Sequence, residues 1–333
     1  MVGRAIDVGY GWTKFTVGEL RNHNGVLDVA VDAFQSAPFP KPTTMDTGGL
    51  ARGPRLWTVR VDGEEMAVSE APAMLAVGAS LRVRGDNYVN TTAYEVCMAA
   101  AVKSMNLNHI DHLVVGTPVG NFDHVRSVLK DKYRDGICFD DRHVAIGSLR
   151  VIAQPVGGLI WHYLATQRGG EIKGVNRLLV DVGYGTLDWV VANGLVVNAS
   201  RSGSASVGVS SFIEGAYRVV RDGRTGIDQD ATLLDGLDGL LVRGIPTYYR
   251  GKKWERSDFE EMIAAKAKQA VQAILSHIGD AGTLQSVVLM GGGAPLYQTA
   301  LASAFHPLEV EVISAARYAN VKGFQAVAER GNN

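Results

Sequence analysis

The chain has 333 residues, of which 46% are apolar and 20% are charged, and its formal net charge is −1. This composition excludes a disordered chain, and the near-neutral charge gives no broad basic surface for direct nucleic-acid binding. No apolar run reaches the roughly 18 residues that a membrane-spanning helix needs, so no membrane association is expected. The length suits two domains of about 150 residues each.

The sequence carries no signature of a secretory leader, a disulfide framework or a zinc site. The first residues, MVGRAIDVGYGW, lack the apolar region of a signal peptide. The two cysteines, Cys97 and Cys138, form no Cys-x-x-Cys pair, and the eight histidines show no metal-ligand spacing. Cys97 lies in an apolar run and is expected to be buried. We therefore expect a soluble protein of the cytoplasm.

The N-terminal region predicts short strands and turns. Residues 4–17 predict a strand, a glycine-rich turn and a second strand, and a strand around 27–31 is expected to pair with them. Residues 35–54 are rich in Pro, Thr and Gly and predict a loop. Residues 56–68 predict a hairpin, because their central Asp-Gly pair favours a tight turn. The elements that follow are predicted to be helices at 91–105, 122–133 and 156–167 and strands at 112–118 and 144–153.

The N-terminal pattern recurs at residues 178–191, which again predict a strand, a glycine-rich turn and a strand. A repeat with so long a period indicates a duplicated domain and not a solenoid. The remaining predicted elements are a strand at 195–200, a helix at 207–221, an irregular glycine-rich segment at 232–251, a helix at 258–278, a strand at 287–290 and a helix at about 315–329.

The first glycine-rich turn predicts a phosphate site. Its sequence is Asp7-Val8-Gly9-Tyr10-Gly11-Trp12-Thr13-Lys14. Glycines at positions 9 and 11 let backbone N–H groups approach an anion closely, while Thr13 offers a hydroxyl and Lys14 a cation. Trp12 belongs to the same turn, although its ring, like that of Trp189, is expected to pack. Asp7 repels a bare phosphate, so we expect a hydrated Mg²⁺ between the two.

The second turn repeats the first with the Gly-Tyr-Gly core unchanged. It consists of Asp181, Val182, Gly183, Tyr184, Gly185 and Thr186. Two such turns are able to hold phosphates from opposite sides, and Asp7 and Asp181 are then able to share one Mg²⁺ through its water ligands.

Two further features fit the same chemistry. Gly291, Gly292, Gly293 and Ala294 follow a predicted buried strand, and glycines there allow a flat purine or ribose to lie on the backbone. Gln154 precedes Pro155 between the two halves, and a glutamine amide orients a water for in-line attack on phosphorus.

These four features, in this order, resemble the actin, sugar-kinase and heat-shock ATPase superfamily over nearly the whole chain. The matching segments are 7–14, 151–164, 178–190, 287–296 and 315–328. The resemblance implies an α/β, actin-like (ribonuclease H-like) duplicated fold with two domains around a nucleotide cleft. Domain I is expected at 1–165, with an insertion at about 20–90, plus the C-terminal helix 316–333. Domain II is expected at 166–315, with a smaller subdomain at about 204–280.

Finer features resemble the bacterial plasmid-segregation actins of the ParM/StbA type, and especially component D of PRTRC cassettes. They are the segments 203–210, 115–119 and 315–324. This resemblance implies ATP hydrolysis coupled to head-to-tail filament growth, with a DNA-bound adaptor protein as partner. It places Gly208 and Gly291–Gly293 near the ribose and base, and it gives Gln154, Asp181 and Asp7 catalytic roles. ParM proteins usually have glutamate at the position of Gln154, and eukaryotic actin has glutamine.

Two alternatives remain open at this point. A small-molecule kinase of the same fold needs a carboxylate base beside a substrate hydroxyl, and residues 91–150 contain aspartates but no recognisable motif. A nucleotide-binding scaffold without significant turnover needs the same ATP site, since fold alone does not fix function.

Overall fold

The computed structural model describes residues 1–42, 53–75, 83, 85, 87–166, 174–221 and 230–331. The chain forms two compact units. Unit 1 consists of Met1–Thr117, Asn121–Ile152 and Phe324–Asn333, and unit 2 of Pro118–Gly120 and Ala153–Gly323. Among the described residues, no helix is both long enough and apolar enough to cross a membrane.

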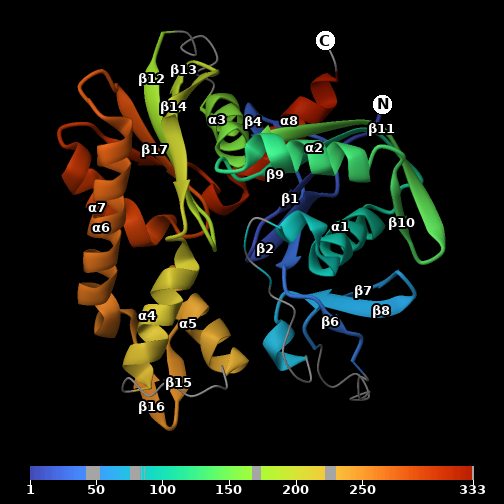
Figure 1. The fold of residues 1–333 in the computed structure, drawn as a ribbon, viewed down its shortest axis with the longest axis horizontal. Helices are drawn as coiled ribbons and strands as arrows, with labels where there is room; N and C mark the ends of the chain where they lie inside the picture. The colour runs from blue at the N-terminus through green and yellow to red at the C-terminus, as the bar shows by residue number, and fades with distance from the viewer. Residues whose placement is uncertain are drawn as a thin grey trace. The chain divides into compact units, whose positions relative to one another are not determined.

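Unit 1 is built on a six-stranded mixed sheet with the strand order β10-β11-β9-β1-β2-β5 (Figure 1). The strands are β1 (Gly3–Val8), β2 (Trp12–Thr16), β5 (Val31–Gln35), β9 (His109–Thr117), β10 (Ile137–Phe139) and β11 (Arg142–Ala153). Strand β1 is antiparallel to β2 and parallel to β9, and all of its residues are buried. It therefore runs through the core of this unit and fixes the turn that follows it.

The strand predicted around 27–31 is only partly correct. The strand that pairs with β2 is β5, which begins at Val31. Val26–Asp28 forms β4 and pairs with β3 (Arg21–His23) in a separate small hairpin. Asn24 and Gly25, both at positive φ, form its turn. An Asn-Gly pair is a strong hairpin signal, and the sequence interpretation overlooked it.

A smaller sheet of unit 1 has the order β6-β8-β7, with β6 at Phe39–Pro40, β7 at Leu56–Val61 and β8 at Glu64–Ser69. The predicted hairpin at 56–68 is confirmed, and its turn residues Asp62 and Gly63 have φ angles of 50° and 85°. Helix α1 (Thr92–Met105) contacts both this sheet and the large one. It begins at Thr91, whose side chain accepts a hydrogen bond from the Tyr94 N–H. Helix α2 (Phe122–Lys132) matches its prediction.

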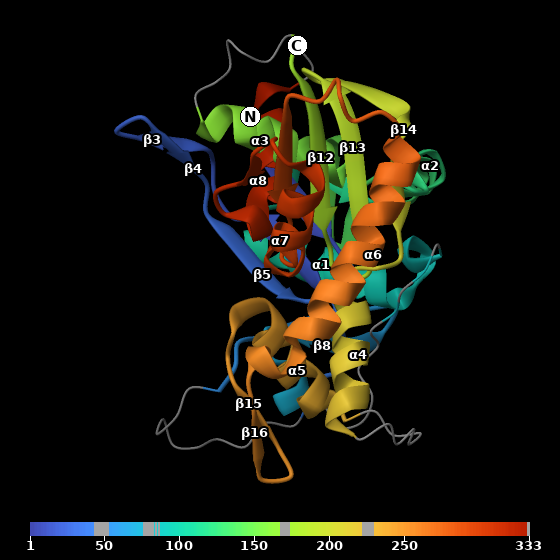
Figure 2. The same ribbon diagram turned by 90° about the vertical axis from the view of Figure 1, so that its left-hand side faces the viewer.

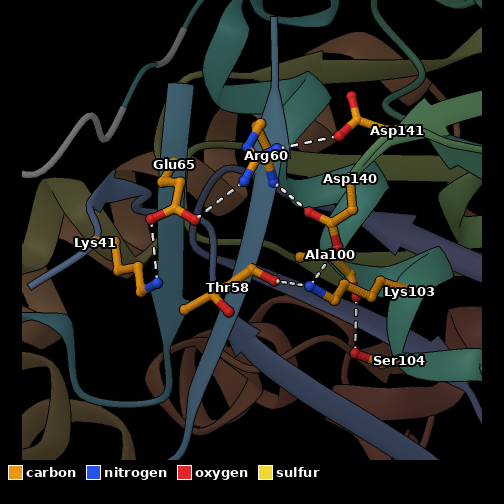
Figure 3. Close-up of polar contacts among 9 residues, drawn as sticks. All are labelled: Lys41, Thr58, Arg60, Glu65, Ala100, Lys103, Ser104, Asp140 and Asp141. Atoms are coloured by element: carbon orange, nitrogen blue, oxygen red, sulfur yellow. Dashed lines mark hydrogen bonds and ion pairs between the residues drawn. The ribbon is translucent and has the colours of Figure 1, made fainter. Parts of the chain in front are cut away.

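An ion-pair network on unit 1 connects the small sheet to α1 and to the turn between β10 and β11 (Figure 3). Its charged members are Lys41, Arg60, Lys103, Glu65, Asp140 and Asp141. Asp140 accepts the Arg60 backbone N–H at 2.7 Å and is ion-paired with Lys103, which also donates to the Thr58 carbonyl at 2.6 Å. The hydrogen bonds to the Arg60 N–H and the Thr58 carbonyl join the β10–β11 turn and α1 to strand β7.

An Asp140→Ala variant is expected to have a free energy of unfolding about 1–2 kcal/mol lower, because the Arg60 N–H loses its acceptor and Lys103 loses its ion pair. Burial acts to raise the pKa of Asp140, but the hydrogen bonds from Lys103 and Arg60 outweigh it and the pKa is lowered. A lowered pKa stabilises the folded state above the unfolded pKa and stops doing so as the pH falls through the folded one. Denaturant unfolding at pH 7 and pH 3 should therefore show a smaller deficit at pH 3. Asp141→Ala is the control, since that side chain is 86% exposed; equal losses in both variants contradict the assignment.

Unit 2 is built on a five-stranded sheet with the order β14-β13-β12-β17-β18 (Figure 2). The strands are β12 (Asn176–Val182), β13 (Leu187–Asn193), β14 (Val196–Ala205), β17 (Ser286–Met290) and β18 (Val310–Val312). Strand β12 is antiparallel to β13 and parallel to β17. Helix α3 (Gln154–Ala165) lies on one side of the sheet, and α6 (Glu260–Ile278) and α7 (Ala294–Phe305) lie on the other (Figure 1).

The prediction of an irregular segment at 232–251 is wrong. Residues Ala231–Arg243 form helix α5, and Thr247–Tyr249 and Lys252–Trp254 form the hairpin β15–β16. The glycines inside the helix misled the interpretation. A Cβ at Gly236 would lie 2.3 Å from the Thr247 Oγ1, so glycine there permits close packing of the helix on β15. Helix α5 packs against α4 (Val209–Val220) at one end of the sheet (Figure 2).

Helices α3 and α8 (Ala319–Arg330) touch through glycine. A Cβ at Gly323 would lie 1.8 Å from the carbonyl oxygen of Gly157, and one at Gly158 would lie 2.1 Å from the Met290 sulfur. Only glycine at position 323 allows the two helices to approach this closely, because a Cβ there would clash with the backbone of Gly157. Gly323 is also the last residue of unit 2, and the rest of α8 belongs to unit 1.

Candidate functional site

The first glycine-rich turn connects β1 to β2, and we call β1, the turn and β2 the first hairpin. The Gly9 N–H donates to the Trp12 carbonyl at 3.2 Å and closes the turn. A Cβ at Gly9 would lie 3.1 Å from that same oxygen, so the turn leaves little room for a side chain at this position. Asp7, the first residue of the motif, is fully buried and forms an ion pair of 2.9 Å with Lys14, directly opposite on β2.

Ser36, a buried residue directly after β5, supports the first hairpin through two hydrogen bonds. The Ser36 N–H donates to the Gly11 carbonyl at 3.0 Å, and the Ser36 and Thr13 hydroxyls are hydrogen-bonded at 2.8 Å. Cys97 lies beside them and is buried as predicted, and burial raises its pKa to about 12. The predicted phosphate donor Thr13 therefore uses its hydroxyl inside the protein, which leaves backbone N–H groups as the donors of this turn.

A Ser36→Ala variant is expected to have a free energy of unfolding about 1–2 kcal/mol lower, because the fully buried Thr13 hydroxyl loses its hydrogen bond to Ser36. A Ser36→Ala/Thr13→Val double variant is expected to recover part of the loss, since removing both partners leaves no unsatisfied group. Denaturant unfolding of Ser36→Ala, Thr13→Val and the double variant measures the difference. A double variant less stable than the sum of the two single changes contradicts the pairing.

The second glycine-rich turn connects β12 to β13, and we call these elements the second hairpin. Its geometry repeats that of the first. The Gly183 N–H donates to the Thr186 carbonyl at 2.9 Å, and a Cβ at Gly183 would lie 3.2 Å from that oxygen. Asp181 is buried before the turn, as Asp7 is. The sequence repeat is therefore a structural repeat, with the same closing hydrogen bond in both units.

The N-terminus of α4 lies on the second turn. The N–H groups of Gly208, Val209 and Ser210 donate to the carbonyls of Gly185, Gly183 and Tyr184, at 3.3, 3.0 and 2.8 Å in that order. A Cβ at Gly208 would lie 2.6 Å from the Tyr184 carbonyl oxygen. Gly208 thus permits the close contact between the helix and the turn, and the three bonds fix the shape of the turn.

The glycine turn after β17 lies against Asp181. Gly291 has a φ of 88°, and a Cβ there would lie 2.4 Å from the Asp181 Oδ1. The Gly293 N–H donates to the Val182 carbonyl at 3.0 Å, and its Cβ position is closed by Val182 and Val209. Gly292 faces open space apart from Arg317, and the buried Ala294 begins α7. Asp181 therefore lies beside the backbone of a glycine segment, Gly291–Gly293, which has no side chains.

Asn320 on α8 is a site residue that the sequence interpretation missed. Its Nδ2 donates to the Asp181 Oδ2 at 2.6 Å, and both side chains are buried. Its Oδ1 is buried and has no hydrogen-bond partner among the described residues. The two residues are 139 positions apart, and the local signal was the resemblance of segment 315–324 to a family motif, which does not show that Asn320 contacts Asp181.

The remaining predicted residues are Gln154 and Trp12. Gln154 is the buried first residue of α3, which packs against β12 and β13. Trp12 is half-buried in the first turn, and Trp189 is buried in the core of unit 2 as expected. The similar sequence around the two turns suggests that Trp12 and Trp189 occupy matching places, but they do not: Trp189 lies opposite Val180, a position equivalent to that of Phe15 opposite Ile6.

The structure thus brings most of the predicted residues together as one group in each unit. Unit 1 holds Asp7, Gly9, Gly11, Trp12, Thr13 and Lys14 on a single hairpin. Unit 2 brings together four segments distant in sequence, which are 181–186, 208–210, 291–294 and Asn320. Among the described residues, no cluster of three or more His, Cys, Asp or Glu side chains is arranged to hold a metal.

Comparison with known proteins now identifies the chain. A model of the N-terminal domain of actin-like proteins matches residues 5–157, and a model of the C-terminal region of archaeal MreB-like actin homologues matches residues 179–303. The chain is an actin-like protein. No curated protein sequence matches it closely enough to count as a relative.

Solved structures of actin-like proteins have the same fold. The archaeal actin homologue Ta0583 in complex with ADP has a TM-score of 0.74 at 20% identity, covering 99% of this chain and 100% of that one. A non-polymerisable quadruple mutant of pCBH ParM has a TM-score of 0.74 at 19% identity, covering 98% of each chain. A 15-stranded ParM filament from Clostridium botulinum has a TM-score of 0.73 at 17% identity, covering 99% of this chain and 100% of that one. The predicted actin-like duplicated α/β fold is confirmed.

Proposed function

We propose that this chain is an ATPase that binds Mg²⁺–ATP at its two glycine-rich turns and assembles head to tail into filaments. The observation that carries the proposal is the repeated turn geometry, in which a buried aspartate precedes a glycine turn closed by one backbone hydrogen bond in each unit. Backbone N–H groups in such turns attract anions without the cost of placing a side chain.

Lys14 and the glycine turns supply the charge and the space that a polyphosphate needs. In the first hairpin, Lys14 balances Asp7, and its ammonium group is available to a phosphate oxygen when the ion pair rearranges. In the second, the helix α4 N-terminus adds a positive dipole end next to the turn. The bare backbone of Gly291–Gly293 suits a flat ribose or base.

The residues also fit a hydrated Mg²⁺. Mg²⁺ keeps several waters and takes few carboxylates, so Asp7 and Asp181 are the residues that would hold it. The buried Asn320 Oδ1, which has no partner among the described residues, fits an acceptor for a water ligand. The ion neutralises negative charge on the phosphates when it is bound. Gln154 is assigned to orient the attacking water, because its buried amide begins a helix that packs on the second hairpin.

The assembly and its use are proposed from the related structures. A ParM filament is among the solved neighbours, and head-to-tail contacts of identical subunits make open filaments. The proposed role is segregation of plasmid DNA through a DNA-bound adaptor protein in the cytoplasm, as the ParM/StbA resemblance implies. The proposed domains are those expected from the sequence, 1–165 with 316–333 and 166–315.

Light scattering and phosphate release, recorded together with ATP, GTP and a non-hydrolysable ATP analogue, test this function. We expect ATP and its analogue to raise scattering, and phosphate to appear with ATP only after assembly begins. Nucleotide binding without assembly or phosphate release favours a scaffold without turnover. Phosphate transfer to an added sugar in place of water favours a kinase, and either result rejects the filament ATPase.

A further inference from the structure

Asp188 on β13 has the register position in the second hairpin that Lys14 has in the first. Lys14 lies opposite Asp7 and neutralises it, whereas Asp188 lies opposite Asp181. Like charges directly opposite on neighbouring strands destabilise a sheet. A second carboxylate at this position therefore needs its own donors, and the structure provides them.

Three donors converge on the Asp188 carboxylate, which is 1% exposed. The Val119 backbone N–H donates to its Oδ1 at 3.1 Å, and the Thr186 hydroxyl donates to its Oδ2 at 2.6 Å. The Ser204 hydroxyl on β14 is the third donor. Burial raises the pKa of Asp188, and the three hydrogen bonds act in the opposite direction. A buried carboxylate with this set of donors has few alternative orientations.

The hydrogen bond of Val119 joins the segment Pro118–Gly120 to the second hairpin. Pro118–Gly120 groups with unit 2, although the residues on both sides of it group with unit 1. A Cβ at Gly120 would lie 3.3 Å from the Ser204 Cβ, so the segment packs against β14 as well. The Asp188 side chain therefore holds the segment Pro118–Gly120 through the Val119 backbone N–H.

We propose that Asp188 is a positioning residue that couples the second phosphate turn to the segment Pro118–Gly120, through Thr186 on one oxygen and Val119 on the other. The inference rests on the proposed function, because it assumes that the turn binds phosphate. Thr186 closes the turn with its carbonyl and holds Asp188 with its hydroxyl. Phosphate binding that draws the turn toward the ligand shifts Thr186, and the same rigid carboxylate transmits the shift to the Val119 N–H.

Hydrogen exchange of the full chain, with and without a non-hydrolysable ATP analogue and Mg²⁺, tests the coupling. In the unmodified chain, the analogue is expected to change exchange about tenfold at residues 183–186 and at the Val119 amide. Thr186→Val keeps the shape and the Val119–Asp188 bond but removes the hydroxyl. It is expected to leave the Val119 amide protected without ligand, and to abolish the response of that amide to the analogue.

Asp188→Ala is expected to make the Val119 amide exchange fast in both states while residues 183–186 still respond. Asp140→Ala is the matched control, because Asp140 also holds a distant backbone N–H, that of Arg60, but in unit 1; it should leave the Val119 response unchanged. A Val119 response that persists in Thr186→Val overturns the inference. No response at residues 183–186 in the unmodified chain instead rejects the proposed function.

Discussion

Replacing Asp181 with asparagine is expected to weaken Mg²⁺-dependent ATP binding and turnover by about 10²–10³-fold while the chain stays folded. The reason is that the change removes a buried negative charge but keeps the size of the side chain beside Gly291. Calorimetric titration with ATP, with and without Mg²⁺, measures the effect. In the unmodified chain Mg²⁺ should strengthen binding, and in Asp181→Asn that gain should disappear.

Asn320 allows a sharper version of this experiment. The double variant Asp181→Asn/Asn320→Asp keeps one amide and one carboxylate in the 2.6 Å contact but moves the charge from β12 to α8. We expect this exchange to preserve stability without restoring the Mg²⁺ dependence. Asp141→Asn is the control for loss of a carboxylate outside the glycine turns, since that side chain is 86% exposed. Unchanged Mg²⁺ dependence in Asp181→Asn contradicts the role assigned to Asp181.

Replacing Gly323 with alanine is expected to lower the free energy of unfolding by about 3 kcal/mol. The added Cβ would lie 1.8 Å from the Gly157 carbonyl oxygen, and backbone cannot rotate away as a flexible side chain does. The expected fall in unfolding temperature is roughly 6–12 °C. Gly53→Ala is the matched control, because nothing lies within 4 Å of a Cβ at that position. Equal melting temperatures for the two variants contradict the close packing of α3 on α8.

The parts of the site that the sequence predicted are those that a short segment defines. Asp7 and Asp181 each precede a glycine turn between two apolar strands, and strand, turn and strand are neighbours in the chain. The glycines are recognisable in the sequence, and the structure explains them, because a Cβ at Gly9 or Gly183 would lie only 3.1 or 3.2 Å from the carbonyl oxygen that closes the turn. The repetition of the motif then indicates a duplicated unit, which the structure bears out as a repeated closing hydrogen bond.

The parts that the sequence did not predict depend on partners far away in the chain. Asn320 reaches Asp181 across 139 positions, and Val119 reaches Asp188 across 69. Ser36 supports Thr13 only because β5 returns beside β2. The segments 115–119 and 315–324 resemble family motifs, but the sequence does not say which distant residue each of them contacts. The same limit explains helix α5, whose internal Gly236 reads as a loop residue until its neighbour Thr247 is known.

The proposed function requires that nucleotide binds at the glycine turns of both hairpins. Hydrogen exchange at residues 9–14 and 183–186 of the unmodified chain, measured while ATP analogue and Mg²⁺ are titrated, tests it most directly. We expect exchange to slow at both turns and at 291–294 along a single binding curve with one nucleotide per chain. Slowing at only one turn, or two curves with different midpoints, contradicts it.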